Sequence, residues 1–221
     1  MLIDNTWADA AGIRAPSLAV PTFRCMPAPN ISCGHSDVMN GIIVCSQATL
    51  PESCNGSGPT WACPRAATIA SSRCAACARW RVRLERHTQS ALAIAEWLQQ
   101  RAEVAEVIFP ALPGSRGHEL WKRDFTGACG LFGVVLHPVA KARVDAHART
   151  GLRLFRLGWS WGGFESLIIP AHPERIRTAT RWEAAGPYLR LHVGLEDPQD
   201  LIADLEDGLT RLASNEPHPV D

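Results

Sequence analysis

The chain lacks a net charge, because its 221 residues carry 22 lysines plus arginines against 22 aspartates plus glutamates. Without a basic excess, it has no electrostatic footprint for a nucleic acid. It also lacks an apolar run long enough to cross a bilayer and a basic N-terminal region followed by an apolar core, so neither a membrane nor a secretory signal is expected. A globular cytoplasmic protein is therefore the first expectation.

Cysteine is almost absent from the C-terminal two thirds of the chain. Seven of the eight cysteines lie between Cys25 and Cys77, and the eighth is Cys129. Before residue 82 the sequence is rich in Pro, Ser, Cys and Gly without lasting periodicity, whereas helices and strands are easy to assign after it. We therefore expect two unlike parts, of which the second has a conventional core.

No cysteine or histidine set has convincing metal-ligand spacing. Cys74 and Cys77, with Cys63 and Cys54, are compatible with a zinc or redox site, but no second close pair accompanies them. The histidines His35, His87, His118 and His192 are scattered and lack ligand spacing, and the last three are interpreted as surface or core-edge residues. We predict no metal site.

After residue 82, strands and helices alternate, which predicts an α/β domain over residues 82–212. Apolar residues recur at helical spacing over 84–102, and a helix is expected from Pro138 to about Thr150. Asp197 as N-cap and Pro198 as first residue predict a last helix, followed by a polar tail at 213–221. Strands are expected at residues 103–109, 131–136, 152–157 and 188–193, with a short apolar run at 167–170.

Two stretches of this domain have the residue types of a ligand site. Ser160–Ser166 contains paired glycines, which let a backbone approach a ligand closely. In the strand 188–193, alternation places Arg190 and His192 on one face, and the arginine is a planar fork suited to a carboxylate. Taken alone, these residues favour an arginine in an ordinary surface ion pair, and only the family motifs reverse that preference.

The two stretches resemble the cystathionine β-lyase branch of the Cys/Met-metabolism enzymes, which use pyridoxal phosphate (PLP). The resemblance extends through Val82–His87, Trp121–Gly127 and Leu201–Glu206, and an Asn-Thr-Trp strand end at residues 1–8 and the run Gly34–Gly41 also match. It implies the C-terminal small domain of a type I PLP-dependent fold, like that of aspartate aminotransferase, preceded by a remnant of the large domain. The resemblance implies that the rest of the family's large domain, with its cofactor phosphate-binding loop, is missing ahead of Met1.

The resemblance also implies an activity, a cofactor and partners. The activity is PLP-dependent Cβ–S cleavage of cystathionine to homocysteine, pyruvate and ammonia, by a homotetramer acting on a small sulfur amino acid. Another PLP carbon–sulfur lyase or cystathionine γ-synthase is the alternative. Asp4 would pair with the pyridine nitrogen of the cofactor. Arg190 would bind the substrate α-carboxylate, and Ser160 and Trp161 would line the pocket.

One position departs from the family pattern in a way that bears on activity. The family order T-K-Y-I-S-G-H-S-D places the cofactor-binding lysine five residues before the histidine, and that position is Asn30 here. An amide neither forms a Schiff base nor moves the α-proton. The sequence therefore also supports a second interpretation, in which the chain is a non-catalytic remnant or a mis-framed reading.

The coding sequence offers an explanation for Asn30. Codons for Thr-Lys-Tyr-Ile, regrouped by one base, give Ala-Pro-Asn-Ile-Ser, the sequence of residues 28–32, and codons for Leu-Arg-Gly-Leu-Arg regroup to Cys74–Ala78. We hypothesise that within residues 1–81 about 10–32 and 42–81 are translated out of the ancestral frame. A sequence translated out of frame has no hydrophobic pattern selected for folding, so these residues are not expected to specify one fold.

Overall fold

The computed structural model of the protein describes residues 2–4, 23–27, 41–45, 79–139, 143–145, 148, 151–184 and 186–214. Of the first three segments only the backbone is described. The expected Schiff-base position, Asn30, and the cysteines at positions 54, 63, 74 and 77 lie outside the described residues.

A five-stranded sheet organises this part of the chain. Its spatial order is β4 (Val104–Ile108), β5 (Leu131–Leu136), β8 (Tyr188–His192), β7 (Leu167–Ala171) and β6 (Arg156–Leu157). All neighbours are antiparallel except β6 and β7, which are parallel. The central strands are β5, β8 and β7, so a residue on β8 is held between two hydrogen-bonded neighbours.

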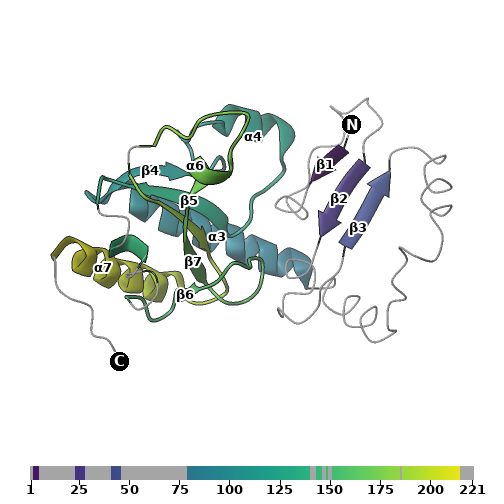
Figure 1. The fold of residues 1–221 in the computed structure, drawn as a ribbon. Coiled ribbons are helices and arrows are strands. Elements are labelled where there is room, and N and C mark those ends of the chain that lie inside the picture. Colours follow the sequence, from purple (N-terminus) through teal and green to yellow (C-terminus); the bar gives the residue numbers. More distant parts are fainter. Residues whose placement is uncertain are drawn as a thin grey trace, which may run out of the picture.

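Two helices cover one face of this sheet (Figure 1). Helix α3 (Trp80–Gln99) and helix α7 (Pro198–Ser214) contact each other, and their apolar stripes face the sheet. The core they form with β5 and β8 is closely filled, and its members include Ile94, Leu98, Phe132, Val134, Leu191, Val193, Leu201 and Leu205. Burial of these side chains contributes most of the stabilisation, at roughly 25 cal/mol per Å² of apolar area.

Most elements predicted from the sequence are present. The helix expected at 84–102 is α3 at 80–99, and the strands expected at 103–109, 131–136 and 188–193 are β4, β5 and β8. Residues 143–145 and 148 are helical within the helix expected from Pro138. The backbone N–H of Gln199 donates to Asp197 Oδ1 at 2.8 Å, which confirms the predicted cap of α7.

The prediction of a strand at 152–157 is wrong for the first four residues. Only Arg156–Leu157 are strand, because the backbone N–H groups of residues 153–155 donate to the Asp204 carboxylate on α7 instead of to a neighbouring strand. The distances are 2.8 Å for Arg153, 2.8 Å for Leu154 and 3.1 Å for Phe155. A side chain from a distant helix thus replaces a β-ladder.

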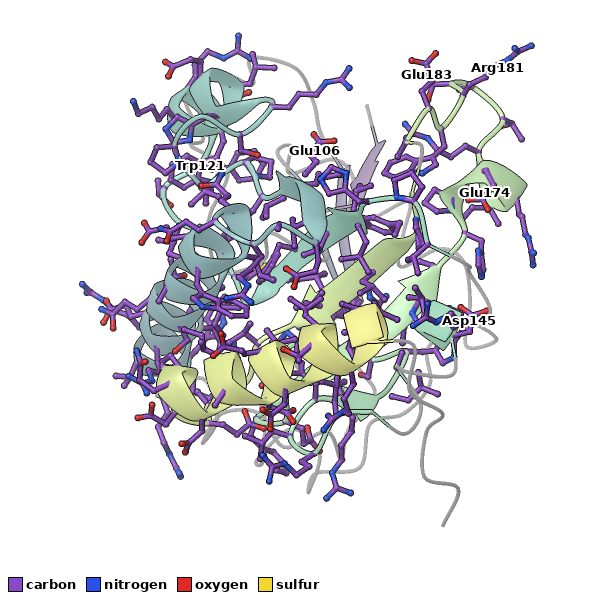
Figure 2. All side chains as sticks on the ribbon, turned by 90° about the vertical axis from the view of Figure 1, so that its left-hand side faces the viewer. Glu106, Trp121, Asp145, Glu174, Arg181 and Glu183 are labelled. Carbon is purple, nitrogen blue, oxygen red and sulfur yellow. The ribbon has the colours of Figure 1, made fainter. Side chains whose placement is uncertain are left out.

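Two shorter helices lie outside the main layer. Helix α4 (His118–Asp124) follows the first edge strand, and helix α6 (Pro173–Ile176) follows β7. Figure 2 shows Glu174, Arg181 and Glu183 together on the segment around α6, on the opposite side of the view from Trp121 near α4. The loops that carry these residues therefore leave the sheet at different places.

A separate three-stranded sheet is formed by β1 (Leu2–Asp4), β2 (Phe23–Pro27) and β3 (Gly41–Cys45). Strand β1 is parallel to β2, and β2 is antiparallel to β3. The sequence analysis expected no element at 23–27 or 42–45, although the β-branched residues Ile42, Ile43 and Val44 favour extended backbone. Among the helices of the described residues, we find none with the length and apolar composition of a bilayer span.

Candidate functional site

The face of β8 that is turned away from α3 and α7 carries the candidate site. Leu189, Leu191 and Val193 belong to the helix-covered core, as the alternation predicts, which leaves Tyr188 and Arg190 on the other face, while His192 at the end of the strand contacts His87 of α3. Arg190 is half-buried and stands opposite Gly133 of β5 and Ile169 of β7. The strand is central in the sheet, so this face is held rigidly.

Arg190 holds the Ser160–Ser166 turn through backbone carbonyls. Its Nη2 donates to the carbonyl oxygen of Trp159 at 2.7 Å and, at longer range, to those of Ser160 at 3.3 Å and Gly158 at 3.4 Å. Among the described residues, all hydrogen bonds recorded for this guanidinium come from Nη2. Its Nε and Nη1 are thus the donors with which it can address a carboxylate.

Burial acts on the charge of Arg190. Desolvation lowers the pKa of its guanidinium from the usual value, and the Tyr188 hydroxyl nearby raises it. An arginine remains protonated throughout the physiological range despite such a shift. A half-buried cation of this kind interacts more strongly with an anion than an exposed one does, since fewer water molecules screen it.

The turn has a backbone that favours glycine. Gly162 has a φ of 83°, in the left-handed region, and Gly162 and Gly163 are buried. Ser160 is exposed and Trp161 is half-buried, and the carbonyl of Ser160 is one of those that Arg190 contacts. The structure therefore brings Ser160, Trp161 and Arg190 together around one turn.

The far end of the turn is fixed by a second set of hydrogen bonds. Ser166 is fully buried, and the Glu196 carboxylate accepts its backbone N–H at 2.9 Å and its hydroxyl at 2.8 Å. The Ser166 hydroxyl in turn accepts the backbone N–H of Gly194 at 2.9 Å. The turn is thus anchored at both ends to the segment that begins with β8.

The interpretation of His87 and His192 as scattered surface or core-edge residues is wrong. Both are buried, with 4% and 2% of their surface exposed, and their rings meet edge to face with centroids 5.5 Å apart. The sequence carried a signal, because His87 lies three residues after Leu84 and four before Ala91 on the apolar stripe of α3. What the sequence did not reveal is that α3 and β8 bring the two rings together.

The buried pair is neutral at physiological pH. Burial, and then the Arg83 cation, lower the pKa of His87 to about 4. Burial, and then His87, lower the pKa of His192 to about 3, against a hydrogen bond to the Gly163 carbonyl. The other two histidine positions differ from this pair: His118 contacts the Pro110 carbonyl at 2.8 Å, and His35 lies outside the described residues.

The remaining candidate positions are less informative. Asp4 ends β1, and its side chain is not among those described. Cys129 is a free thiol whose pKa is raised by burial, so it is not a reactive thiolate. Among the described residues no group of three histidine, cysteine or acidic side chains is placed to hold a metal ion.

A hollow lies beside Tyr188, at the other end of β8 from His192. It has a volume of about 220 Å³, and Trp182 and Tyr188 meet edge to face at its wall, with ring centroids 5.1 Å apart. Asp145 and Glu174 line it as well, and Figure 2 shows both on the side of the fold where β7 ends. Tyr188 is two residues from Arg190, so this hollow borders the candidate site.

Comparison with known proteins places the chain in one family. The sequence profile described as Cys/Met metabolism PLP-dependent enzyme matches residues 1–210. The chain is 40% identical to cystathionine β-lyase MetC of Escherichia coli over 215 residues, which cover 96% of this chain and 54% of that protein. It is 38% identical to the Salmonella typhimurium cystathionine β-lyase over 216 residues, again 96% and 54%. The chain thus spans about half the length of the curated relatives it matches.

Solved structures give the same fold. The cystathionine γ-synthase of Xanthomonas oryzae in complex with aminoacrylate and cysteine superposes with a TM-score of 0.80 at 30% identity, over 97% of this chain and 56% of that one. The metB protein of Corynebacterium glutamicum superposes with a TM-score of 0.76 at 28% identity, over 96% and 55%. The mixed α/β sheet described above is therefore part of a type I PLP fold, as the sequence predicted.

Proposed function

Because this chain belongs to the Cys/Met-metabolism PLP-dependent enzymes, we propose that the full-length protein from which it derives cleaves the Cβ–S bond of cystathionine. The products are homocysteine, pyruvate and ammonia. The support is the 40% identity to a protein named cystathionine β-lyase, together with the motifs around Arg190. The proposed partners are a small sulfur amino acid and three further copies of the same chain.

The observation that carries this proposal is the position of Arg190. One edge of its guanidinium is fixed by the carbonyls of residues 158–160, and the rest of the fork is directed by that restraint. A fixed guanidinium binds a carboxylate at low entropic cost, because little side-chain freedom remains to be lost. Arg190 is accordingly assigned to the substrate α-carboxylate, and Ser160 and Trp161 to the wall of the pocket.

This chain lacks a lysine at the position where the family holds its cofactor covalently. PLP supplies an electron sink for the substrate, and in these enzymes a lysine holds the resting cofactor as a Schiff base. Position 30 has an amide in place of this lysine. Lys122, on α4, has a 59% exposed side chain with its ammonium 3.7 Å from Glu119, so it is a surface residue. We therefore assign no catalytic step to this chain, and Asp4 is proposed only as a partner of the pyridine nitrogen.

A second proposal concerns the chain as printed, namely that it is a non-catalytic remnant. It rests on Asn30, which stands where the family has its cofactor-binding lysine. Residues 82–212 would then be the ordered domain, and about 10–32 and 42–81 would be out of the ancestral frame. In this state the chain is at most a passive partner of a full-length tetramer.

Cystathionine γ-synthase is the alternative activity for the full-length protein. A Mycobacterium tuberculosis protein of that name is 33% identical over 217 residues, and the Xanthomonas oryzae structure has the same name. A full-length protein carrying residues 82–212 would decide between the two activities. Release of pyruvate from cystathionine supports the lyase, whereas formation of cystathionine without pyruvate release contradicts it.

The remnant proposal is tested on the purified chain. PLP is added, followed by borohydride, and the protein is digested and analysed by mass spectrometry. We expect no visible Schiff-base absorption, no specific reduced adduct and no pyruvate from cystathionine. A single modified lysine, either Lys122 or Lys141, together with lyase activity would overturn the proposal.

A further inference from the structure

We infer that His192 is a positioning residue, which holds the Ser160–Gly163 turn in the shape that Arg190 and the pocket wall require. The functional importance of this role rests on the proposed function, in which the turn lines the substrate pocket. The hydrogen bond that holds the turn does not depend on that function. His192 is 2% exposed, so it acts through the turn rather than by touching a substrate.

The contact that carries the inference is a hydrogen bond from the turn to the imidazole. The backbone nitrogen of Gly162 lies 3.0 Å from His192 Nε2 and 3.4 Å from Nδ1, so its N–H is directed at the imidazole near both ring nitrogens. An N–H bonds only to an unprotonated ring nitrogen, and the shorter distance assigns Nε2 as the acceptor, with the proton on Nδ1. The same Nε2 lies 3.3 Å from the Gly163 carbonyl, a contact that needs the opposite tautomer. The shorter contact selects the first.

The hydrogen bond stabilises the buried backbone of the turn. Gly162 has a positive φ, and a buried backbone N–H without a partner costs about 1–3 kcal/mol. His192 supplies that partner. Two residues earlier on the same strand, Arg190 holds the carbonyls of Trp159 and Ser160. One strand thus fixes the turn at two points, by a donor and by an acceptor.

His87 keeps His192 in the state that this contact needs. The two rings are edge to face, and both are neutral because their pKa values are lowered by burial. The hollow beside them measures only about 10 Å³, which is the size of one water molecule and far below the size of a substrate or cofactor site. The histidine pair is therefore not a ligand site, and its role is to fix the position of the turn.

Hydrogen exchange of the Gly162 amide, followed by NMR on the purified chain uniformly labelled with ¹⁵N, tests the inference. His192→Phe keeps a ring of similar shape but removes the acceptor. We therefore expect the exchange rate of the Gly162 amide to increase by a factor at least ten times larger than the increase at the Ile94 amide in the core. His192→Gln places an amide oxygen near the position of Nε2 and should restore protection. His118→Phe, at a histidine near the surface, is the matched control and should leave Gly162 unchanged.

A purely packing role predicts a different result, because Phe would then fill the space at least as well as Gln. Equal Gly162 exchange in the Phe and Gln variants would overturn the inference. If the Phe variant fails to fold, the ¹⁵N shifts of His192 in the unaltered chain decide: a protonated Nδ1 supports the inference, and a protonated Nε2 contradicts it. Neither measurement needs PLP or turnover, so an inert chain would count against the proposed lyase and not against this role.

Discussion

The Asp204 carboxylate on α7 accepts the backbone N–H of Leu154 at 2.8 Å, and two neighbouring amides bond to the same group. Asp204 is 1% exposed, so its charge is compensated by these three donors rather than by water. The contact joins the last helix to the segment that leads through β6 into the Ser160–Ser166 turn. A long-range carboxylate thus sets the start of the candidate site.

Asp204→Asn should destabilise the domain by about 2 kcal/mol or more, because an amide has one acceptor oxygen for three donors and no charge. The free energy of unfolding would be measured by urea denaturation, followed by circular dichroism. Asp207→Asn is the matched control on the same helix: its carboxylate pairs with Arg153 at 3.2 Å, and both side chains are more than half exposed. That variant should differ from the parent by less than about 0.5 kcal/mol. Equal losses in the two variants would refute the assignment.

Glu196→Gln should loosen the far end of the turn. The carboxylate accepts two hydrogen bonds from the buried Ser166, and the replacement leaves an amide nitrogen facing one of the donors. We expect a loss of about 1–2 kcal/mol and faster hydrogen exchange in peptides that cover residues 160–166. Glu206→Gln serves as the control, since Glu206 pairs with Arg101 at the surface and its side chain is half exposed. Unchanged exchange in the Glu196 variant would contradict this account.

The stability of the domain should fall as the pH drops below about 6.5. The folded-state pKa values of His87 and His192 are lowered to about 4 and about 3, so the unfolded chain binds more protons between these values and 6.5. The stability contributed by the neutral pair is fully present above pH 6.5 and is lost progressively down to the folded-state values. For His87 the shift from 6.5 to about 4 corresponds to about 3 kcal/mol.

Urea denaturation at a series of pH values measures this loss. His192→Gln removes one titrating group and should make the fall in stability between pH 6.5 and pH 4 less steep than in the parent chain. His118→Gln is the control, and its slope should match that of the parent. Identical slopes for the parent and the His192 variant would show that the buried pair does not control the acid response.

The gene itself provides the test of the frame hypothesis. The bases that encode Ala28–Ser32 should spell Thr-Lys-Tyr-Ile in a neighbouring frame, and those under Cys74–Arg81 should spell Leu-Arg-Gly-Leu-Arg-Thr-Leu-Ala. Sequencing of the gene checks both segments at once. Codons that do not regroup in this way would refute the hypothesis. If they do regroup, independent resequencing distinguishes two cases. In a sequencing error the real protein has the lysine, and in a true frameshift in the gene Asn30 is real.

The sequence was sufficient for elements whose signal is local. Periodic apolar residues predicted α3 and α7, and Asp197 followed by Pro198 predicted the start of α7, because caps and helical stripes depend on neighbours a few residues apart. Alternation along residues 188–193 placed Arg190 on the face opposite the core. The glycine pair and the family motifs located the turn at 160–166. These features need no knowledge of the tertiary structure.

The tertiary structure decided what depends on residues far apart in the chain. Asp204 shortened the expected strand at 152–157 by binding amides about fifty residues away, and no local pattern predicts such a contact. His87 and His192 each looked ordinary in sequence, and only the packing of α3 against the sheet makes them a buried pair. The carbonyl contacts of Arg190 also required the fold, because a strand and a turn thirty residues apart must meet. Sequence supplies the chemical groups, whereas burial and long-range hydrogen bonds fix their charge and position.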